Sequence, residues 1–151
     1  MKVYSPYERV SENVVKAGQI VMFDVAGKLA LFLVVSYKNG EVGYLGLDGE
    51  CVGKIEYPTN GKVFLYKEDV KLVLPHEASG WSGVKQPTGP LLVAIASGAT
   101  YFVYSQYDKL AAANIVTGEI TDSPYQANYV NHWAIFSSAS ENPLVQGVTP
   151  D

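Results

Sequence analysis

The sequence predicts an all-β fold, and three observations support this prediction. Short runs rich in β-branched and aromatic residues recur from residue 19 to residue 137, and such runs are typical of strands. Glycine-containing turn signals separate these runs at roughly the eight- to twelve-residue spacing of small β-folds. The alanine-rich run from Leu110 to Asn114 is too short, and too close to Gly118, to form a stable helix.

Residues 1–17 are expected to form an N-terminal arm ahead of the first strand. Pro6 interrupts this segment, and Tyr4, Tyr7 and Val10 are spaced without a clean period. A short helix over residues 8–16 stays open as an alternative with weak support.

Residues 18–74 are predicted to hold the strands of a first β-module. Residues 29–37 begin with apolar residues on both faces, as expected of a central strand buried on both sides. Asn39-Gly40 predicts a two-residue type I′ hairpin, in which both turn residues have positive φ, and Asp48-Gly49 is a second such signal. Residues 67–69 suit a 3₁₀ turn. The expected strands are 19–25, 29–37, 41–47, 50–57, 62–66 and 70–74, the last of which closes the module.

This series of five or six short strands, with a one-turn helix before the last, resembles the small SH3-like barrels. The resemblance is one of architecture, covers residues 18–74 and implies a small β-barrel. Small OB-like barrels show a similar pattern. The resemblance assigns a function to no residue.

The second half of the chain predicts a second antiparallel β-module after a break. Residues 75–90, rich in Gly, Pro and Ser around Trp81, predict a linker or a packed loop. Residues 91–137 are expected to form the module, with turns at residues 97–98 and 117–118. Residues 138–151, which include Pro143 and Pro150, predict an extended C-terminal tail. The expected strands of the module are 91–96, 99–105, 110–116, 119–121 and 129–137.

The charge of the chain favours a protein partner over a nucleic acid. Charged residues make up 17% of the sequence, below the roughly 25% of typical soluble domains. A surface covered by neutral and apolar groups is typical of proteins that contact other proteins. The net charge of −4 argues against nucleic-acid binding, which needs a basic surface.

Features of the sequence also limit where the chain is expected to act. Cys51 is the only cysteine, so no internal disulfide forms and a reducing compartment is the default. No segment has the pattern of a classical signal peptide. The longest apolar run, residues 29–35, is shorter than the roughly 18 residues of a membrane helix. These features make the cytoplasm the expected location, with no membrane contact and no secretion by a classical signal peptide.

No catalytic, metal or cofactor motif is found, so the chain is not expected to be an enzyme and no cofactor is assigned. His76-Glu77 begins an H-E-x-x-H pattern, but the second histidine position is Gly80. The glycines of GEVGYLGLDG do not form a G-x-G-x-x-G sequence and no helix is expected after them. A cysteine nucleophile needs a general base, and nothing near Cys51 in the sequence supplies one. Free cysteines usually pack as small hydrophobic residues.

The eleven tyrosines are the most unusual count in the composition. Tyrosine gives a large contact area and a hydrogen-bonding tip at low entropic cost, which interfaces favour. Tyrosines are also ordinary strand residues, and exposed rings bind sugars and bases, so these two alternatives stay open. The predicted interface residues are the aromatic residues of the second half: Tyr101, Tyr104, Tyr107, Tyr125, Tyr129 and Trp133.

These features predict a non-enzymatic structural or assembly protein that acts through protein–protein contacts. In composition and build the chain is similar to the small β accessory proteins of tailed-phage particles, such as capsid decoration, head and tail proteins. That resemblance implies a homo-oligomer bound to other structural subunits, such as a major capsid or tail protein, and a location in the virion. The alternative is a small β-barrel binding module for a peptide, nucleic acid or carbohydrate, with loops 26–28, 48–49 and 58–61 as its binding loops.

Overall fold

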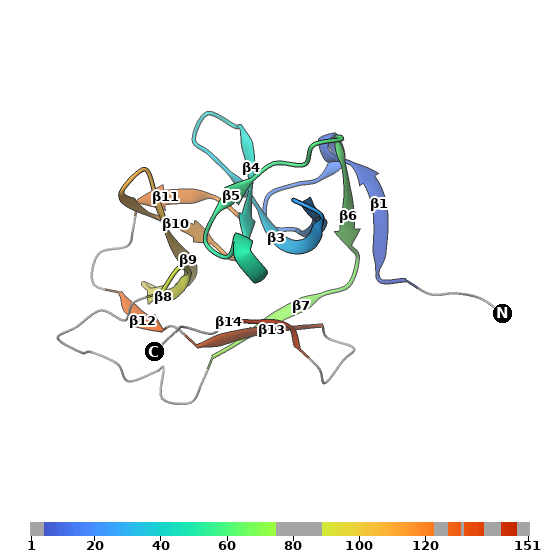
Figure 1. Cartoon of the computed structure of the whole chain (residues 1–151). Coiled ribbons are helices and arrows are strands. Elements are labelled where there is room, and N and C mark those ends of the chain that lie inside the picture. Colours follow the sequence, from blue (N-terminus) through green and yellow to red (C-terminus); the bar gives the residue numbers. More distant parts are fainter. Residues whose placement is uncertain (1–4, 75–88, 123–126, 131, 138–142, 148–151) are drawn as a thin grey trace.

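The structure is a computed structural model that describes residues 5–74, 89–122, 127–130, 132–137 and 143–147. Their regular structure consists of antiparallel β-sheets and two 3₁₀ turns, so the prediction of an all-β fold is confirmed (Figure 1). The strands are β1 (Tyr7–Ser11), β2 (Ile20–Val25), β3 (Lys28–Ser36), β4 (Val42–Gly46), β5 (Ile55–Glu56), β6 (Lys62–Tyr66), β7 (Val70–Val73), β8 (Leu92–Ala96), β9 (Ala99–Gln106), β10 (Lys109–Asn114), β11 (Ile120–Asp122), β12 (Asn128–Val130), β13 (Trp133–Ser137) and β14 (Pro143–Gly147), and the 3₁₀ turns are η1 (Glu12–Val14) and η2 (Gly49–Cys51).

The first segment forms a six-stranded sheet in the order β1-β6-β2-β3-β4-β5. Its two edge strands, β1 and β5, do not pair with each other in the described part of the chain, so the sheet is open and no closed barrel forms. All its pairings are antiparallel.

The segment expected to be an N-terminal arm contains a strand of this sheet. β1 pairs with β6 along its whole length, from Tyr7 opposite Tyr66 to Ser11 opposite Lys62. The rings of Tyr7 and Tyr66 meet edge to face with centroids 5.1 Å apart, a geometry that stabilises aromatic pairs. The helical alternative for residues 8–16 is wrong, because only residues 12–14 form a 3₁₀ turn.

β3 is the central strand that its apolar sequence predicts. Successive side chains of a strand point to opposite faces, and here both faces are buried. Leu31, Leu33 and Val35 belong to the main core, whereas Ala30, Phe32 and Val34 belong to a second cluster on the other face.

Two turns of the first segment differ from their predicted form. Asn39-Gly40 ends a hairpin, but its loop has three residues: the Gly40 N–H donates to the Tyr37 carbonyl at 2.9 Å and only Gly40 has positive φ. This is the type I turn with a glycine bulge rather than the type I′ turn. Asp48-Gly49 leads into η2 instead of a two-residue turn, so β4 and β5 pair across a longer loop and the expected strand over residues 50–57 shortens to β5.

The second segment forms a five-stranded sheet in the order β11-β10-β9-β8-β12. The predicted hairpin around residues 117–118 is confirmed by the pairing of β10 with β11. A third sheet, in the order β14-β13-β7, lies across one end of the other two sheets (Figure 1).

The three-stranded sheet joins strands of the two predicted β-modules. β7 was expected to close the first module, but it pairs with β13 of the second segment, with Leu72 opposite Ile135. β14, in the segment expected to be an extended tail, pairs with the other side of β13. Since β7 and β13 are far apart in sequence, only the folded chain brings them together.

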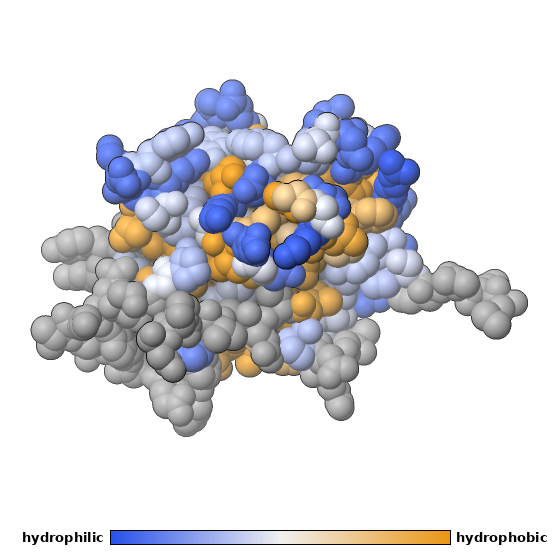
Figure 2. Space-filling model, in the orientation of Figure 1, coloured by the Kyte–Doolittle hydropathy of each residue, from blue (hydrophilic) through white to orange (hydrophobic). Residues whose placement is uncertain are grey.

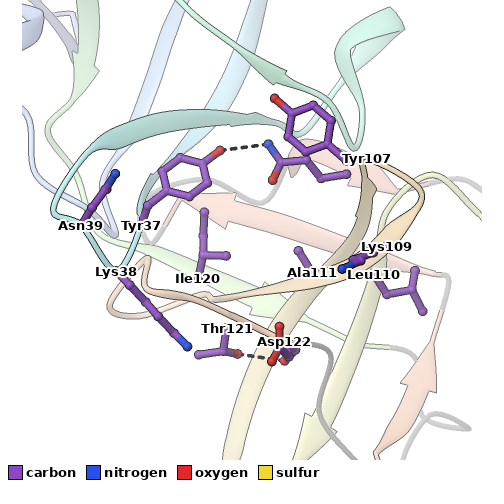
Figure 3. Close-up of a pocket in the computed structure, with 11 residues that line it drawn as sticks. Tyr37, Lys38, Asn39, Tyr107, Lys109, Leu110, Ala111, Ile120, Thr121 and Asp122 are labelled. Atoms are coloured by element: carbon purple, nitrogen blue, oxygen red, sulfur yellow. Dashed lines mark hydrogen bonds between the residues drawn. The ribbon is translucent and has the colours of Figure 1, made fainter.

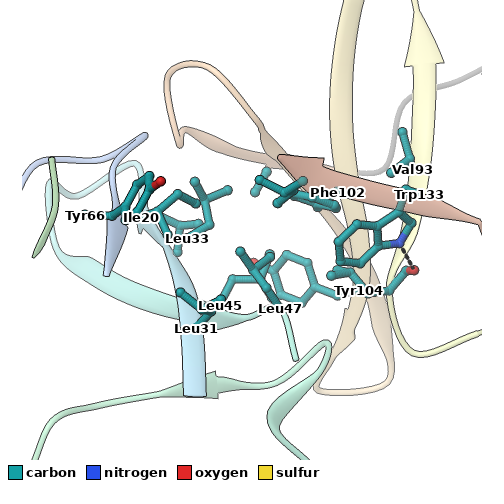
Figure 4. Close-up of a cluster of buried hydrophobic side chains, with 14 of the residues drawn as sticks. Ile20, Leu31, Leu33, Leu45, Leu47, Tyr66, Val93, Phe102, Tyr104 and Trp133 are labelled. Carbon is teal, nitrogen blue, oxygen red and sulfur yellow. Dashed lines mark hydrogen bonds between the residues drawn. The ribbon is translucent and has the colours of Figure 1, made fainter. Parts of the chain in front are cut away.

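One main core is built from all three sheets (Figure 4). In it the six-stranded sheet contributes Leu33 and Leu45, and the five-stranded sheet contributes Phe102 and Tyr104. Trp133 of the three-stranded sheet packs edge-on to Phe102 at 5.0 Å and donates its Nε1–H to the Leu91 carbonyl at 3.3 Å. Both predicted β-segments therefore share this core.

Candidate binding site

An open hollow lies where the tips of two hairpins meet (Figure 3). Its volume is about 470 Å³, within the range of small-molecule and peptide sites. We call it the tip hollow. It is lined by Tyr37, Lys38, Asn39, Gln106, Tyr107, Lys109, Leu110, Ala111, Ile120, Thr121 and Asp122.

Backbone contacts between the two large sheets hold the walls of the tip hollow. The Ser36 N–H donates to the Gly118 carbonyl at 2.8 Å, and Ser36 forms an isolated parallel bridge with Glu119. Gly118 has a φ of +72°, and a Cβ there would lie 2.5 Å from the Val34 carbonyl oxygen. Only glycine allows this approach, which sets the β3–β4 hairpin against β11.

Tyr37 spans the tip hollow from one hairpin to the other. Its hydroxyl accepts a hydrogen bond from the Gln106 side-chain amide at 3.1 Å (Figure 3). Its ring lies against Gly43, where an added Cβ would be 3.2 Å from the ring. The glycine therefore makes room for the ring, and the hydrogen bond fixes the position of Tyr37 before any ligand arrives.

The inner face of β9 runs from the main core into the tip hollow. Phe102, Tyr104 and Gln106 alternate along the strand and so share this face. Ala111, which lines the tip hollow, is the cross-strand partner of Tyr104. Tyr104 itself is only 1% exposed, and its hydroxyl has no hydrogen-bond partner among the described residues. Burial, with smaller contributions from Tyr37 and Tyr57, raises the pKa of Tyr104 far above its ordinary value of 10.0.

Tyr107 stands at the tip of the β9–β10 hairpin, with 91% of its surface exposed. The φ angles of Tyr107 and Asp108 are +52° and +61°, the type I′ geometry that Asn-Gly usually occupies. A bulky side chain at positive φ is a backbone outlier. The fold thus presents an aromatic ring to solvent from a strained backbone position.

The structure separates the six predicted interface residues into different environments. Tyr107 is exposed, while Tyr101 and Tyr129 are half-buried and pack on a small cluster on the outer face of the five-stranded sheet. Tyr104 and Trp133 are buried in the main core, so their assignment to an interface is wrong. Their side chains fill the space between sheets. Tyr125 lies outside the described residues.

Sequence reasoning missed two tyrosines at or near the tip hollow. Tyr37 is the last residue of the predicted strand 29–37. It immediately precedes the Lys38-Asn39-Gly40 loop and so stands at a hairpin end. Tyr57 is 56% exposed and packs edge-on to Tyr44 at 6.3 Å. Burial, followed by the neighbouring Tyr37, raises the pKa of Tyr57. The position of each tyrosine beside a turn signal was the available clue.

The chemical character of the tip hollow is that of a binding surface. Two ammonium groups, Lys38 and Lys109, and one carboxylate, Asp122, stand beside the amides of Asn39 and Gln106. Rings offer contact area, and amides offer both donors and acceptors.

The described residues offer neither a metal site nor a membrane-spanning helix. They contain no group of three or more His, Cys, Asp or Glu side chains placed to hold a metal ion. Within the same part of the chain, no helix is long and apolar enough to cross a membrane.

The loops proposed for a binding module lie elsewhere. Residues 58–60 border a smaller depression of about 140 Å³, together with Asp24 and Leu29, which flank the 26–28 loop. Loop 48–49 does not line this depression. These loops therefore do not form one common site.

Comparisons with protein-family models, with curated proteins and with solved structures found no match to this chain.

Proposed function

We propose that the chain is a non-enzymatic structural or assembly protein that associates through the tip hollow and the Tyr107 hairpin. The observation that carries this proposal is the exposed ring of Tyr107 on a backbone of positive φ. A left-handed conformation costs a non-glycine residue roughly 1–2 kcal/mol. Because Tyr107 is 91% exposed, packing of its side chain within the chain does not offset that cost. Strained residues of this kind cluster at functional positions.

The surface around the tip hollow supports a protein partner. Leu110 and Tyr57 are also large exposed side chains, and tyrosine is enriched at protein interfaces. Figure 2 shows apolar residues at the surface between the hydrophilic groups of the face viewed. An ion pair joins the exposed side chains of Lys28 and Glu50. A surface of this composition suits association better than isolation in water.

The finer proposal is that the chain is an accessory protein of a virus particle, acting as a homo-oligomer on other structural subunits such as a major capsid or tail protein. It rests on the resemblance in composition and build to the small β accessory proteins of tailed phages. The matching location is the virion, or the cytoplasm before assembly.

The mass of the chain in solution tests the assembly proposal. We expect sedimentation equilibrium over a wide range of protein concentration to give a defined oligomer whose population rises with concentration. Salt should have little effect, because the tip hollow combines few charges with large aromatic and apolar contacts. A monomer of 16.4 kDa at every concentration would contradict the proposal.

A carbohydrate-binding module is the second candidate. The observation that favours it is the lining of the tip hollow, where the ring and hydroxyl of Tyr37 stand beside the amide of Gln106. Exposed rings and planar amides are suited to sugars. Titration of the chain with a panel of neutral oligosaccharides, followed by amide chemical shifts, separates the two candidates. Saturable shifts confined to residues of the tip hollow, in a chain that stays monomeric, would favour the sugar.

A further inference from the structure

A second cavity opens at the junction of the three sheets, on residues that the tip hollow does not use. Its volume is about 340 Å³, and we call it the junction pocket. It is lined by Gly18, Ile20, Leu33, Val70, Leu72, Leu74, Thr100, Phe102, Ile115, Val116 and Ile135.

Strand register explains why these side chains converge. Each sheet contributes two neighbouring side chains that share a face. In the six-stranded sheet Ile20 pairs with Leu33, and in the three-stranded sheet Leu72 pairs with Ile135. In the five-stranded sheet Thr100 and Phe102 alternate on one face of β9. The pocket is therefore walled by all three sheets.

The junction pocket continues the main core toward the surface. Ile20, Leu33, Phe102 and Ile135 are buried core residues at its inner end. At its mouth Val70 and Val116 are 38% and 79% exposed. A pocket of this kind is open to solvent at one end and apolar at the other.

The lining of the junction pocket selects an uncharged, apolar ligand. Among the described lining residues no side chain is charged, and the Thr100 hydroxyl is the only polar side-chain group. Placing a charged group there would remove its hydration with no ion partner in return, which is strongly unfavourable. Water is also poorly held in apolar cavities, and such cavities bind small apolar molecules instead.

The shape of the junction pocket favours a small molecule over the flat face of a protein partner. Three sheets surround the occupant, so most of its surface would be buried, as in small-molecule sites of roughly 300–1,000 Å³. Apart from Gly18, Thr100 and Phe102, the described lining residues are all aliphatic. We infer that the junction pocket binds the aliphatic chain of an uncharged small molecule, with the chain end against Phe102 and Ile135 and the other end at Val70 and Val116.

The test uses 1-decanol as the probe and the methyl groups of Ile, Leu and Val as reporters. In the wild-type chain, decanol should shift the methyl resonances of Leu72, Ile135 and Ile20 in a saturable way. The methyl resonances of Val14 and Leu29, which are exposed elsewhere, should not move. No saturable shift in the pocket methyl groups up to the solubility limit of decanol would overturn the inference.

Two tryptophan substitutions on the same strand provide the matched comparison. Val70 and Val73 are 38% and 41% exposed on β7, but only Val70 lines the pocket. Val70→Trp should block the mouth and weaken decanol binding by about tenfold or more. Val73→Trp, on the opposite face of β7, should leave the affinity within about twofold. Equal effects of both substitutions would overturn the inference.

The alternative occupant of the junction pocket is an apolar side chain of another copy of the protein. In that case the pocket methyl groups would shift as the protein alone is concentrated, and decanol would add no further shift. That outcome would replace the small molecule with a subunit contact. Neither result depends on the tip hollow, because no residue lines both cavities.

Discussion

At the scale of single residues, two neighbouring tyrosines lie in opposite environments. Tyr104 and Tyr107 are three positions apart on one hairpin, yet one is buried with an unpaired hydroxyl and the other is almost fully exposed. Tyr104 lies in a run, Tyr101 to Tyr104, that is apolar on both faces of its strand, whereas Tyr107 follows Ser105 and Gln106 in a turn that contains no glycine. Alternation alone therefore cannot say which face is the core, and the sequence could not distinguish the two tyrosines.

The buried hydroxyl of Tyr104 is expected to lower the stability of the native chain. A buried polar group without a partner costs roughly 1–3 kcal/mol, so Tyr104→Phe should raise the free energy of unfolding by about 1 kcal/mol. Tyr66→Phe is the matched control in the same core cluster, because the Tyr66 hydroxyl donates to Glu68 at 3.3 Å. That control should lose stability instead. Urea denaturation measures both, and a loss of stability in Tyr104→Phe would contradict this account.

The same hydroxyl makes stability depend on alkaline pH. The pKa of Tyr104 in the folded chain is raised above its ordinary value of 10.0 by burial, so above pH 10 the unfolded chain releases a proton that the folded chain retains. The free energy of unfolding therefore falls as pH rises above 10. The Tyr104→Phe variant should lose less stability over this range. Parallel curves for the two proteins would show that the Tyr104 phenol is not the group responsible.

At the scale of elements, local sequence signals were sufficient to predict several strands and turns, but not the pairings between strands distant in sequence. The β3 run, the β10–β11 hairpin and the turn at residues 97–98 follow from alternation and turn residues near in sequence, whereas the Tyr107-Asp108 turn between β9 and β10 has no glycine signal. The pairing of β1 with β6 and of β7 with β13 has no local signature, since each joins strands separated by many other elements. Consequently the arm, the closing strand and the tail were assigned from position alone.

The crossing of η2 over β4 is an element contact that depends on one glycine. A Cβ at Gly46 would overlap the carbonyl of Cys51, and backbone cannot move aside as a flexible side chain can. Gly46→Ala should therefore lower the free energy of unfolding by about 2–3 kcal/mol. At Gly43 the neighbour is the Tyr37 ring, so Gly43→Ala should have a smaller effect on stability. Thermal or urea unfolding of both variants tests this, and equal losses would count against the described crossing.

At the scale of the whole molecule, three sheets close around one main core, and the tip hollow and the junction pocket lie at its borders. The core was predictable in kind, because the apolar runs had to be buried. That both segments share this core was not predictable, because no local pattern indicates that β7 pairs with β13. The tip hollow was partly predictable: Tyr107 was expected to be an interface residue, but its neighbours Tyr37 and Gln106 meet only when the two hairpins are packed together.

The central claim is that the Tyr107 hairpin is kept in a strained form because its ring contacts another subunit. Tyr107→Asn removes the ring and places a residue that tolerates positive φ. The matched control is Ser97→Asn, since Ser97 has a φ of +49° at the same position of the β8–β9 turn, away from the tip hollow.

The most direct measurement is the association constant of these two variants by sedimentation equilibrium, paired with their free energies of unfolding. Both asparagine substitutions should stabilise the fold, by about 0.5–1 kcal/mol each. We expect only Tyr107→Asn to weaken association, by about tenfold or more. Association of Tyr107→Asn at the wild-type strength would contradict the account, because the strained ring would then serve no contact.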